Sequence, residues 1–176
     1  MRGIRLLLLV VASVAAFRSE SLAIDFASHP FFKYVVGEWS LEGELKGKEN
    51  TVVSITENWK GRAEENSFYM EGSRTMNGET KPFTWTITHN PATDGYEAVM
   101  AGEAGADPLR FEGSFSEADL TVTLKAITGA GESSIVIRDS FADEAKETIQ
   151  TEVKMLDEQG EVTLEGTLIQ KRIKTP

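Results

Sequence analysis

Six polar residues fall on the apolar side of segments in which apolar and polar residues alternate. A buried charge needs a partner or a wet cavity, because an isolated charge is costly to remove from water. Glu57, Arg74 and Asp139 lie away from the predicted turns, so we expect them to form a polar spot inside the protein. The other three lie near segment ends, where they can reach solvent instead: His89, Gln170 and Arg172.

Glu57 and His89 are the two residue types that acid–base catalysis would use. Counting across the predicted hairpins places Phe68 between them and Trp39 opposite Glu57. Because neighbouring strands are ~4.8 Å apart, this register separates the pair by about 10 Å, too far for direct proton transfer. The chain has no cysteine and two histidines, and it lacks nucleophile, phosphate-loop and metal-binding motifs. We therefore predict no catalytic residue, no metal ligand and no cofactor.

These residues must be positioned by strands. Ten segments of period two follow residue 37, separated by turn-forming clusters; they are 37–46, 51–59, 65–76, 80–90, 95–103, 108–116, 118–127, 132–142, 146–156 and 160–172. The connections are too short for the crossovers that parallel strands need, so sequential strands must be antiparallel. The predicted fold class is all-β, a single antiparallel up-and-down β-barrel of about ten strands.

A short helix is predicted over residues 29–36, where Phe31, Phe32, Val35 and Val36 recur at helical spacing. Their side chains must be buried, and the barrel end beside Trp39 is the nearest apolar surface. We therefore expect the helix to cap one end of the barrel.

Four segments share a Glu-Gly pair in which the glycine falls on the apolar side: Gly43, Gly72, Gly113 and Gly166. Glycine inside a strand marks a sharp bend or a crowded interior, and closing a sheet into a barrel requires such bends. The alternative is that these glycines make room for a ligand.

An apolar interior with a polar spot predicts a binding module for a small lipophilic molecule, since ten strands enclose more space than eight. The predicted ligand contacts are Glu57, Met70, Arg74, Phe83, Trp85, Met100, Phe111 and Asp139. One alternative is a structural or interaction protein with a packed interior. Another is an enzyme that uses the inward polar residues.

Residues 1–23 have the pattern of a signal peptide, with Arg2 and Arg5 before a short apolar run and cleavage after Ala23 or Ala16. The predicted domain is then 24–176, secreted or periplasmic, with 15 basic and 27 acidic residues and a net charge of −12. Such a surface repels phosphate groups, so we expect no nucleic-acid partner. No later apolar run is long enough to span a membrane, so we expect no membrane insertion after cleavage.

Gly37 and Trp39 open the first segment as Gly-x-Trp, and Arg172 lies near the end of the last one. This arrangement resembles that of calycin barrels (lipocalins, fatty-acid-binding proteins, nitrobindins). In lipocalins, the tryptophan packs beneath an arginine or lysine on or after the last strand. The resemblance implies structural roles for Gly37, Trp39 and Arg172, with the cation over the indole ring.

The turn from Asn90 to Tyr96 is most similar to that of an exported bacterial lipocalin-like family of unknown function, which has aspartate where Asn90 stands. Nitrobindins hold haem through a barrel histidine. Neither His29 nor His89 matches that position, so the resemblance implies no haem here.

Overall fold

The computed structural model describes residues 24–129 and 132–174, so the predicted signal segment, 1–23, lies outside the described residues. The elements are α1 (Phe32–Val35), β1 (Gly37–Gly47), a 3-10 turn η1 (Lys48–Asn50), β2 (Val52–Glu64), β3 (Ser67–Met76), β4 (Glu79–Asn90), β5 (Gly95–Ala101), β6 (Leu109–Ser116), β7 (Thr121–Ala126), β8 (Ser134–Phe141), β9 (Thr148–Leu156) and β10 (Val162–Arg172). All ten predicted strands are present. Within the described residues, no helix is long and apolar enough to cross a membrane.

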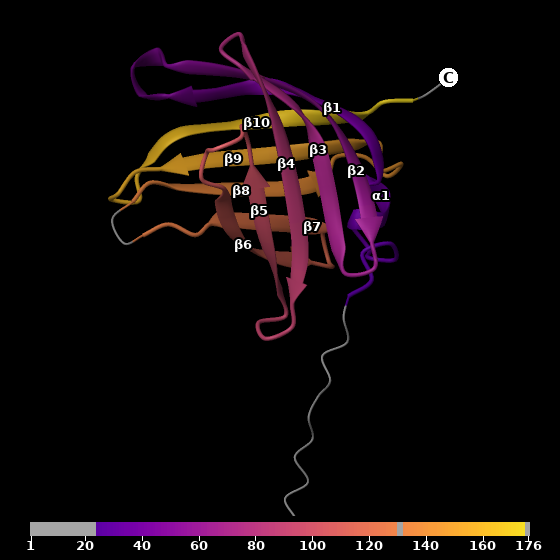
Figure 1. Cartoon of the computed structure of the whole chain (residues 1–176). Helices are drawn as coiled ribbons and strands as arrows, with labels where there is room; N and C mark the ends of the chain where they lie inside the picture. Colours follow the sequence, from indigo (N-terminus) through magenta and orange to yellow (C-terminus); the bar gives the residue numbers. More distant parts are fainter. Residues whose placement is uncertain (1–23, 130–131, 175–176) are drawn as a thin grey trace, which may run out of the picture.

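The strands form one closed antiparallel barrel in which each strand pairs with the next, and β1 pairs with β10 to complete the ring. The predicted fold class is therefore confirmed. β3 and β4 run steeply across β8, β9 and β10, so the barrel is flattened and its opposite walls cross (Figure 1). Side chains from both walls can meet in the middle of such a barrel.

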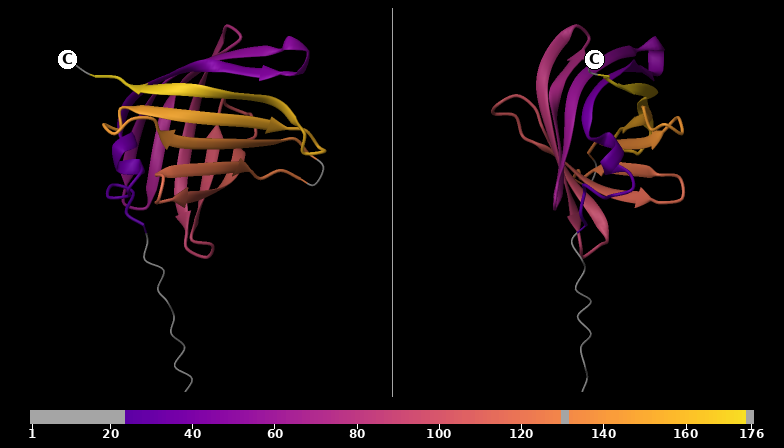
Figure 2. Two further views of the ribbon diagram at one scale, coloured as in Figure 1. Left: turned by 180° about the vertical axis from the view of Figure 1, so that it is seen from behind. Right: turned by 90° about the vertical axis from the view of Figure 1, so that its right-hand side faces the viewer.

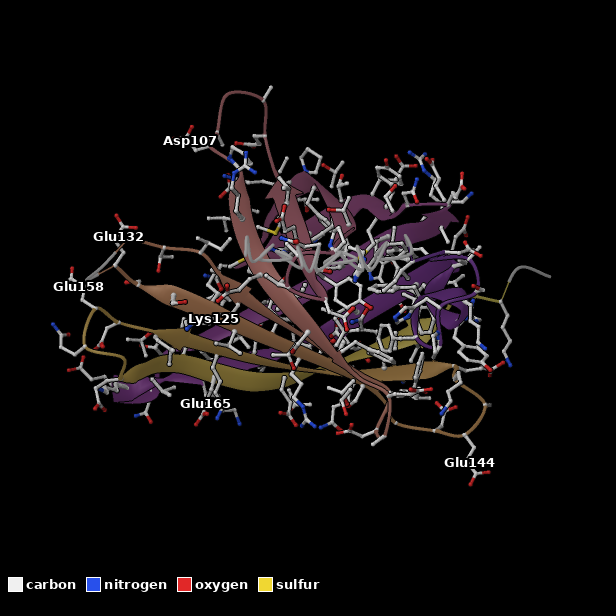
Figure 3. All side chains as sticks on the ribbon, turned by 90° about the horizontal axis from the view of Figure 1, so that it is seen from below. Asp107, Lys125, Glu132, Glu144, Glu158 and Glu165 are labelled. Atoms are coloured by element: carbon white, nitrogen blue, oxygen red, sulfur yellow. The ribbon has the colours of Figure 1, made fainter. Side chains whose placement is uncertain are left out.

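Alternation of residue types decides which side chains fill the barrel. On β4, Phe83, Trp85 and Ile87 are buried, while Thr84 between them is exposed. Charged residues on the other parity and in the loops project away from the barrel, as Lys125 and Glu165 do in Figure 3. The period of two thus predicts the inside and outside of the sheet correctly.

The predicted register of the first hairpins is wrong. Trp39 pairs with Trp59, and Glu57 pairs with Leu41 on one side and with Arg74 on the other. For the β2–β3 hairpin, the reason is that β2 continues to Glu64 and turns over residues 65–66, which contain neither glycine nor proline. This longer strand is what brings Glu57 beside its countercharge.

The helix is shorter than predicted but caps one end of the barrel, where it lies across the opening (Figure 2). Phe31, Phe32 and Val35 are buried, whereas Val36 is 40% exposed and the expectation that it is buried is wrong. Val36 has already left the helix and has an extended backbone, so its side chain points away from the shared helix face.

Gly72 shows why the mid-strand glycines are needed. A Cβ atom there would lie 2.2 Å from the carbonyl oxygen of Asn58 and 2.7 Å from Cβ of Trp59, closer than side chains approach. None of the four repeated glycines lines the central cavity described below. Crowding between neighbouring strands, rather than space for a ligand, accounts for them.

Candidate ligand-binding cavity

The centre of the barrel holds a cavity of about 90 Å³. Its walls come from the α1 cap (Phe31, Phe32 and Val35) and from the inward faces of the strands. This volume exceeds the ~10–15 Å³ that one water molecule needs. It is well below the roughly 300–1,000 Å³ of pockets for drug-sized ligands. Most of the interior is therefore filled by side chains, and the open space suits a few small groups.

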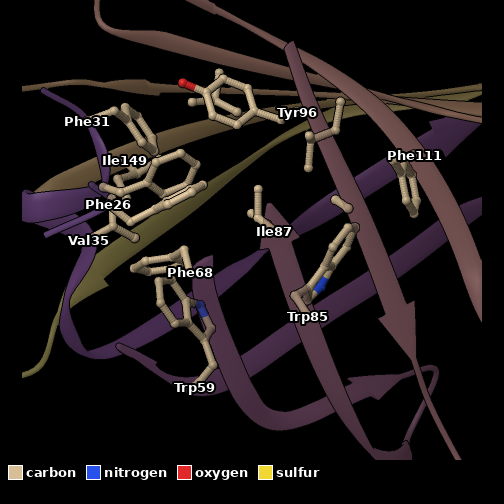
Figure 4. Close-up of a cluster of buried hydrophobic side chains, with 14 of the residues drawn as sticks. Phe26, Phe31, Val35, Trp59, Phe68, Trp85, Ile87, Tyr96, Phe111 and Ile149 are labelled. Carbon is tan, nitrogen blue, oxygen red and sulfur yellow. The ribbon is translucent and has the colours of Figure 1, made fainter. Parts of the chain in front are cut away.

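Aromatic side chains make the apolar wall of the cavity. Trp59, Phe68 and Trp85 line it and are almost completely buried. Figure 4 shows Phe68 and Trp59 close to the α1 end, beside Phe26 and Val35, with Trp85 further along the barrel. Trp59 stacks on Trp39 of the neighbouring strand, with ring centroids 5.8 Å apart. The wall is thus rigid at the capped end.

A buried ion pair forms the first part of the polar wall. Arg74 Nε donates to Glu57 Oε1 over 2.5 Å, and the glutamate side chain is 7% exposed. The guanidinium also lies 5.1 Å from the ring centroid of Phe83 and donates through Nη1 to Met100 Sδ at 3.7 Å. Phe83 and Met100 therefore hold the arginine in place against Glu57.

A chain of three hydrogen-bonded side chains forms the second part. Gln170 Nε2 donates to Thr151 Oγ1 over 2.6 Å, and Thr151 Oγ1 donates to Asp139 Oδ1 over 2.5 Å. The three residues come from β10, β9 and β8, which are consecutive around the barrel. All three side chains line the cavity.

The two parts are adjacent around the barrel and are separated by β1. Leu41 on β1 pairs with Gln170 on one side and with Glu57 on the other. Asp139 pairs with Thr151, whereas Gln170 lies diagonally from Thr151, because Gln170 pairs with Ile149. The polar arc therefore steps diagonally between β9 and β10 as it runs from β8 to β3, and its members are Asp139, Thr151, Gln170, Glu57 and Arg74.

Burial shifts the ionisation of both carboxyl groups in the arc. It raises the pKa of Asp139 from 3.8 to about 6, with a further rise from the charge of Glu57 and a partial offset from the Thr151 hydrogen bond. Burial also raises the pKa of Glu57, against the charge and hydrogen bond of Arg74. Both shifts have the same physical cause, because the cavity solvates charge less well than water does.

Two buried polar atoms beside the cavity have no hydrogen-bond partner among the described residues: Trp59 Nε1 and Gln170 Oε1. Both side chains are about 95% buried, with exposed fractions of 4% and 5%. Buried polar atoms are nearly always paired, so each unpaired one marks a place where a partner is expected.

The end of the barrel opposite α1 is lined by methionine. Apart from Met1, every methionine lies on the inward side of a strand; Met70 lines the cavity, and Met76, Met100 and Met155 follow toward this end. All four are half-buried. Exposed apolar residues also lie at or beside the strand ends on this side, at Val52, Leu109 and Ile127. Flexible methionines make an adaptable lining, which we call the methionine mouth.

Five of the eight predicted ligand contacts line the cavity: Glu57, Met70, Arg74, Trp85 and Asp139. The other three support them from behind. Phe83 and Met100 contact Arg74, and the Phe111 ring lies 4.9 Å from that of Trp85. Thr151, Trp59 and Gln170 line the cavity without having been predicted as ligand contacts, although all three have the inward parity of their strands. The expectation that Gln170 reaches solvent is wrong, because it is buried and bound to Thr151.

The structural residues predicted from the Gly-x-Trp resemblance meet at the capped end. The Arg172 guanidinium lies 4.6 Å from the Trp39 ring centroid. Gly37 has a φ of +118°, which favours glycine, and Arg172 Nη1 lies 3.0 Å from where its Cβ would be. The predicted cation–indole contact is thus present.

The predicted separation of Glu57 from His89 holds, although for a different reason. Glu57 is paired with Arg74, while His89 lies 3.2 Å from Asp94 at the capped end. Neither of the two histidines lines the cavity. Glu57 and His89 therefore do not form a pair with each other in the cavity.

His29 instead organises the cap. Its Nδ1 accepts from the amides of Phe31 and Phe32 at 3.1 and 3.3 Å, so Nε2 carries the proton and donates to the Tyr96 hydroxyl over 2.7 Å. Burial, with smaller contributions from the charges of His89 and Lys33, lowers the pKa of His29 to about 4. A separate surface cavity of about 370 Å³ is lined by both His29 and Tyr96.

Comparison with known proteins supports the fold. The model of a family described as "Protein of unknown function (DUF1579)" matches residues 26–167. No curated protein matches the chain. The S-type phycobiliprotein lyase CPES from Guillardia theta is similar in structure, with 11% identity, a TM-score of 0.56, and coverage of 83% of this chain and 92% of that one.

A second solved structure, EF1p2_mFAP2b bound to DFHBI, has 8% identity and a TM-score of 0.42, and covers 81% of this chain and 97% of its own. At 11% identity, the likeness to the lyase shows the fold alone. The similarity to the lyase agrees with the calycin-like barrel that the Gly-x-Trp pattern predicts.

Proposed function

Because this chain belongs to the DUF1579 family of proteins of unknown function, we propose its function from its own cavity: the barrel binds one small amphipathic molecule. The polar group of the ligand lies on the polar arc, and its apolar part lies against Trp59, Phe68 and Trp85. The observation that carries this proposal is the pair of buried, unpartnered atoms beside the cavity, Trp59 Nε1 and Gln170 Oε1. A ligand with polar atoms would pair them.

The size of the cavity limits what can bind. At about 90 Å³, it is smaller than the engineered ~150 Å³ cavity that admits benzene. A longer apolar tail would have to extend past Met70 into the methionine mouth, where flexible side chains can move aside. The ligand is therefore a short molecule, or a longer one that enters by its polar end.

Export belongs to the same proposal, because the basic start and short apolar run of residues 1–23 are typical of a signal peptide. The intact mass of protein recovered from the periplasm or medium tests it. A mass that begins after residue 23 or 16 supports export. A mass that retains residues 1–16 overturns it.

Binding is tested by native mass spectrometry of the purified full chain, followed by thermal-shift measurements with short alcohols, acids and amines. We expect a copurified small molecule, or a raised melting temperature for at least one compound class. Trp85→Ala should weaken that effect, whereas Thr84→Ala, on the outward side of the same strand, should not. If no compound binds and none copurifies, the barrel is a packed structural domain with water in its cavity.

A further inference from the structure

The charges that line the cavity do not balance. Its lining contains two carboxyl groups, Glu57 and Asp139, and one cation, Arg74. Arg74 is paired directly with Glu57, while the side chain of Asp139, among the residues that the structure describes, is bound only to the neutral Thr151 hydroxyl. With both acids ionised, the cavity carries one net negative charge, and a buried charge without a countercharge is unfavourable.

We propose that the ligand is a small primary amine whose ammonium group is held by Asp139 and Gln170. This inference rests on the proposed function, because it names the class of ligand that the same cavity takes. The ammonium supplies the missing positive charge.

Hydrogen-bond chemistry points the same way. Gln170 Nε2 is committed to Thr151, which leaves Gln170 Oε1 as a buried acceptor without a donor. An ammonium group has three donors and no acceptor, so it can serve Gln170 Oε1 and the Asp139 carboxylate together, while the Trp59 Nε1 donor needs an acceptor elsewhere on the ligand. A carboxylate ligand would instead add a second unbalanced negative charge beside Asp139.

The rest of the cavity suits an alkylammonium ion. The indole of Trp59 and the rings of Phe68 and Trp85 line the same space. Aromatic faces attract a cation, more strongly when both are removed from water. The carbon chain can then follow Met70 toward the methionine mouth, so chain length should matter less than the charge of the head group.

Binding of an amine should depend on pH, because only ionised Asp139 supplies the charge. The charged and polar groups that face it are Glu57, Arg74, Thr151 and Gln170. With a pKa of about 6, the ionised fraction of Asp139 rises roughly tenfold between pH 5 and pH 7. The affinity for an amine should rise by about the same factor, since alkylamines stay protonated throughout this range.

The test is calorimetric titration of the full chain with n-alkylamines of three to eight carbons, beside alkanols and alkanoic acids of equal length. We expect the amines to bind about tenfold or more tightly than the alcohols, with the pH dependence given above only for the amines. Asp139→Asn, which keeps the shape and the Thr151 contact, should remove at least about tenfold of amine affinity and should weaken alcohol binding by a clearly smaller factor.

Glu42→Gln is the matched control, because it removes one negative charge from the exposed side of β1. It should bind amines like the wild type. Equal losses in both variants would show nonspecific attraction to an acidic surface and overturn the inference.

The remaining outcomes separate this inference from the proposed function. If alcohols or acids bind and amines do not, the barrel is a binding module and the amine assignment is wrong. If Asp139→Asn binds amines as tightly as the wild type, the assignment is also wrong. If no compound of any class binds, both fall.

Discussion

Arg172 lies over the indole ring of Trp39, and the same guanidinium binds the cap. Its centre is 4.6 Å from the ring centroid, Nη1 donates to the carbonyl of Val36 over 2.8 Å, and Nη2 donates to that of Tyr34. Trp39 Nε1 donates to the carbonyl of Val35 over 3.0 Å. One pair of side chains thus joins the last strand, the first strand and α1.

We predict that Trp39→Ala destabilises the protein by about 3–5 kcal/mol, because the indole is fully buried and its loss leaves a cavity and breaks the bond to α1. Trp85→Ala should cost a similar amount, since that ring is also buried. The two differ in binding, because Trp85 lines the cavity and Trp39 does not. Denaturant unfolding of both variants, with ligand titration of the folded fraction, checks this. A Trp39→Ala variant as stable as the wild type would contradict it.

Arg74→Met should destabilise the protein by about 3–5 kcal/mol, because it leaves the buried Glu57 carboxylate without its partner. The double variant Glu57→Gln with Arg74→Met should regain most of that loss, since no charge is then stranded. Lys60→Met is the control: it breaks an exposed pair with Glu38 at 3.9 Å and should cost under about 1 kcal/mol. Chemical denaturation at pH 7 measures all three. A double variant no more stable than Arg74→Met would refute the buried-charge explanation.

His29 and Asp139 should give opposite pH dependences of stability. Between pH 4 and 6.5, the unfolded chain protonates His29 and the folded chain does not, so the His29 contribution is present above pH 6.5 and is lost as pH falls toward about 4. Asp139 is protonated in the folded chain up to about pH 6, so its contribution is present below pH 3.8 and is lost as pH rises through about 6. Each amounts to about 3 kcal/mol at most.

The wild type should therefore vary little in unfolding free energy between pH 4 and 6. Asp139→Asn should lose stability on acidification, because the His29 effect then remains without the opposing effect of Asp139. The raised pKa of Glu57 offsets this loss in part. His29→Asn, which can still accept the cap amides, should lose stability as pH rises. Urea unfolding at half-unit pH steps checks this, and parallel profiles for all three proteins would disprove it.

The titratable and charged groups around His29, whose own ionisation contributes to its environment, are His89, Lys33, Asp94, Tyr96, Asp25 and Glu117.

Gly72→Ala should destabilise the protein by about 1–3 kcal/mol or more, because its methyl group has no space beside Asn58 and Trp59. Gly102→Ala is the control, since the nearest atom to its Cβ would be 4.0 Å away, and it should change stability by less than about 0.5 kcal/mol. Thermal denaturation of the two variants shows whether Gly72 is required because its surroundings are crowded. Equal melting temperatures would rule out crowding at Gly72.

The fold could be predicted because its determinants are local. Alternation fixes the inward side of each strand, so Trp85 and Ile87 inside and Thr84 outside follow directly from the sequence. Short connections then leave only sequential antiparallel pairing, and Gly-x-Trp with a late arginine indicates closure. Export and the ligand remain predictions.

The site could be predicted only in part, because a cavity depends on register and on how side chains fill space. Glu57, Arg74 and Asp139 could be identified by parity alone. Their pairing could not, because the turn after Glu64 lacks glycine and proline and the end of β2 was placed too early. The unpaired Gln170 Oε1 depends on the relative register of β8, β9 and β10, which no local pattern encodes.

Closure of the ring by β1 and β10 has a consequence for how the chain acquires its structure. Arg172 reaches a carbonyl 136 positions earlier, so the seam depends on one of the most distant contacts that the chain can make. Contacts of such long range close slowly because the loop between them must be ordered first. During synthesis, β1 and the cap emerge first and wait with one strand edge unpaired until β10 is complete. The barrel can therefore close only after β10 has been synthesised. A variant that lacks β10 should fail to fold rather than form a smaller stable barrel.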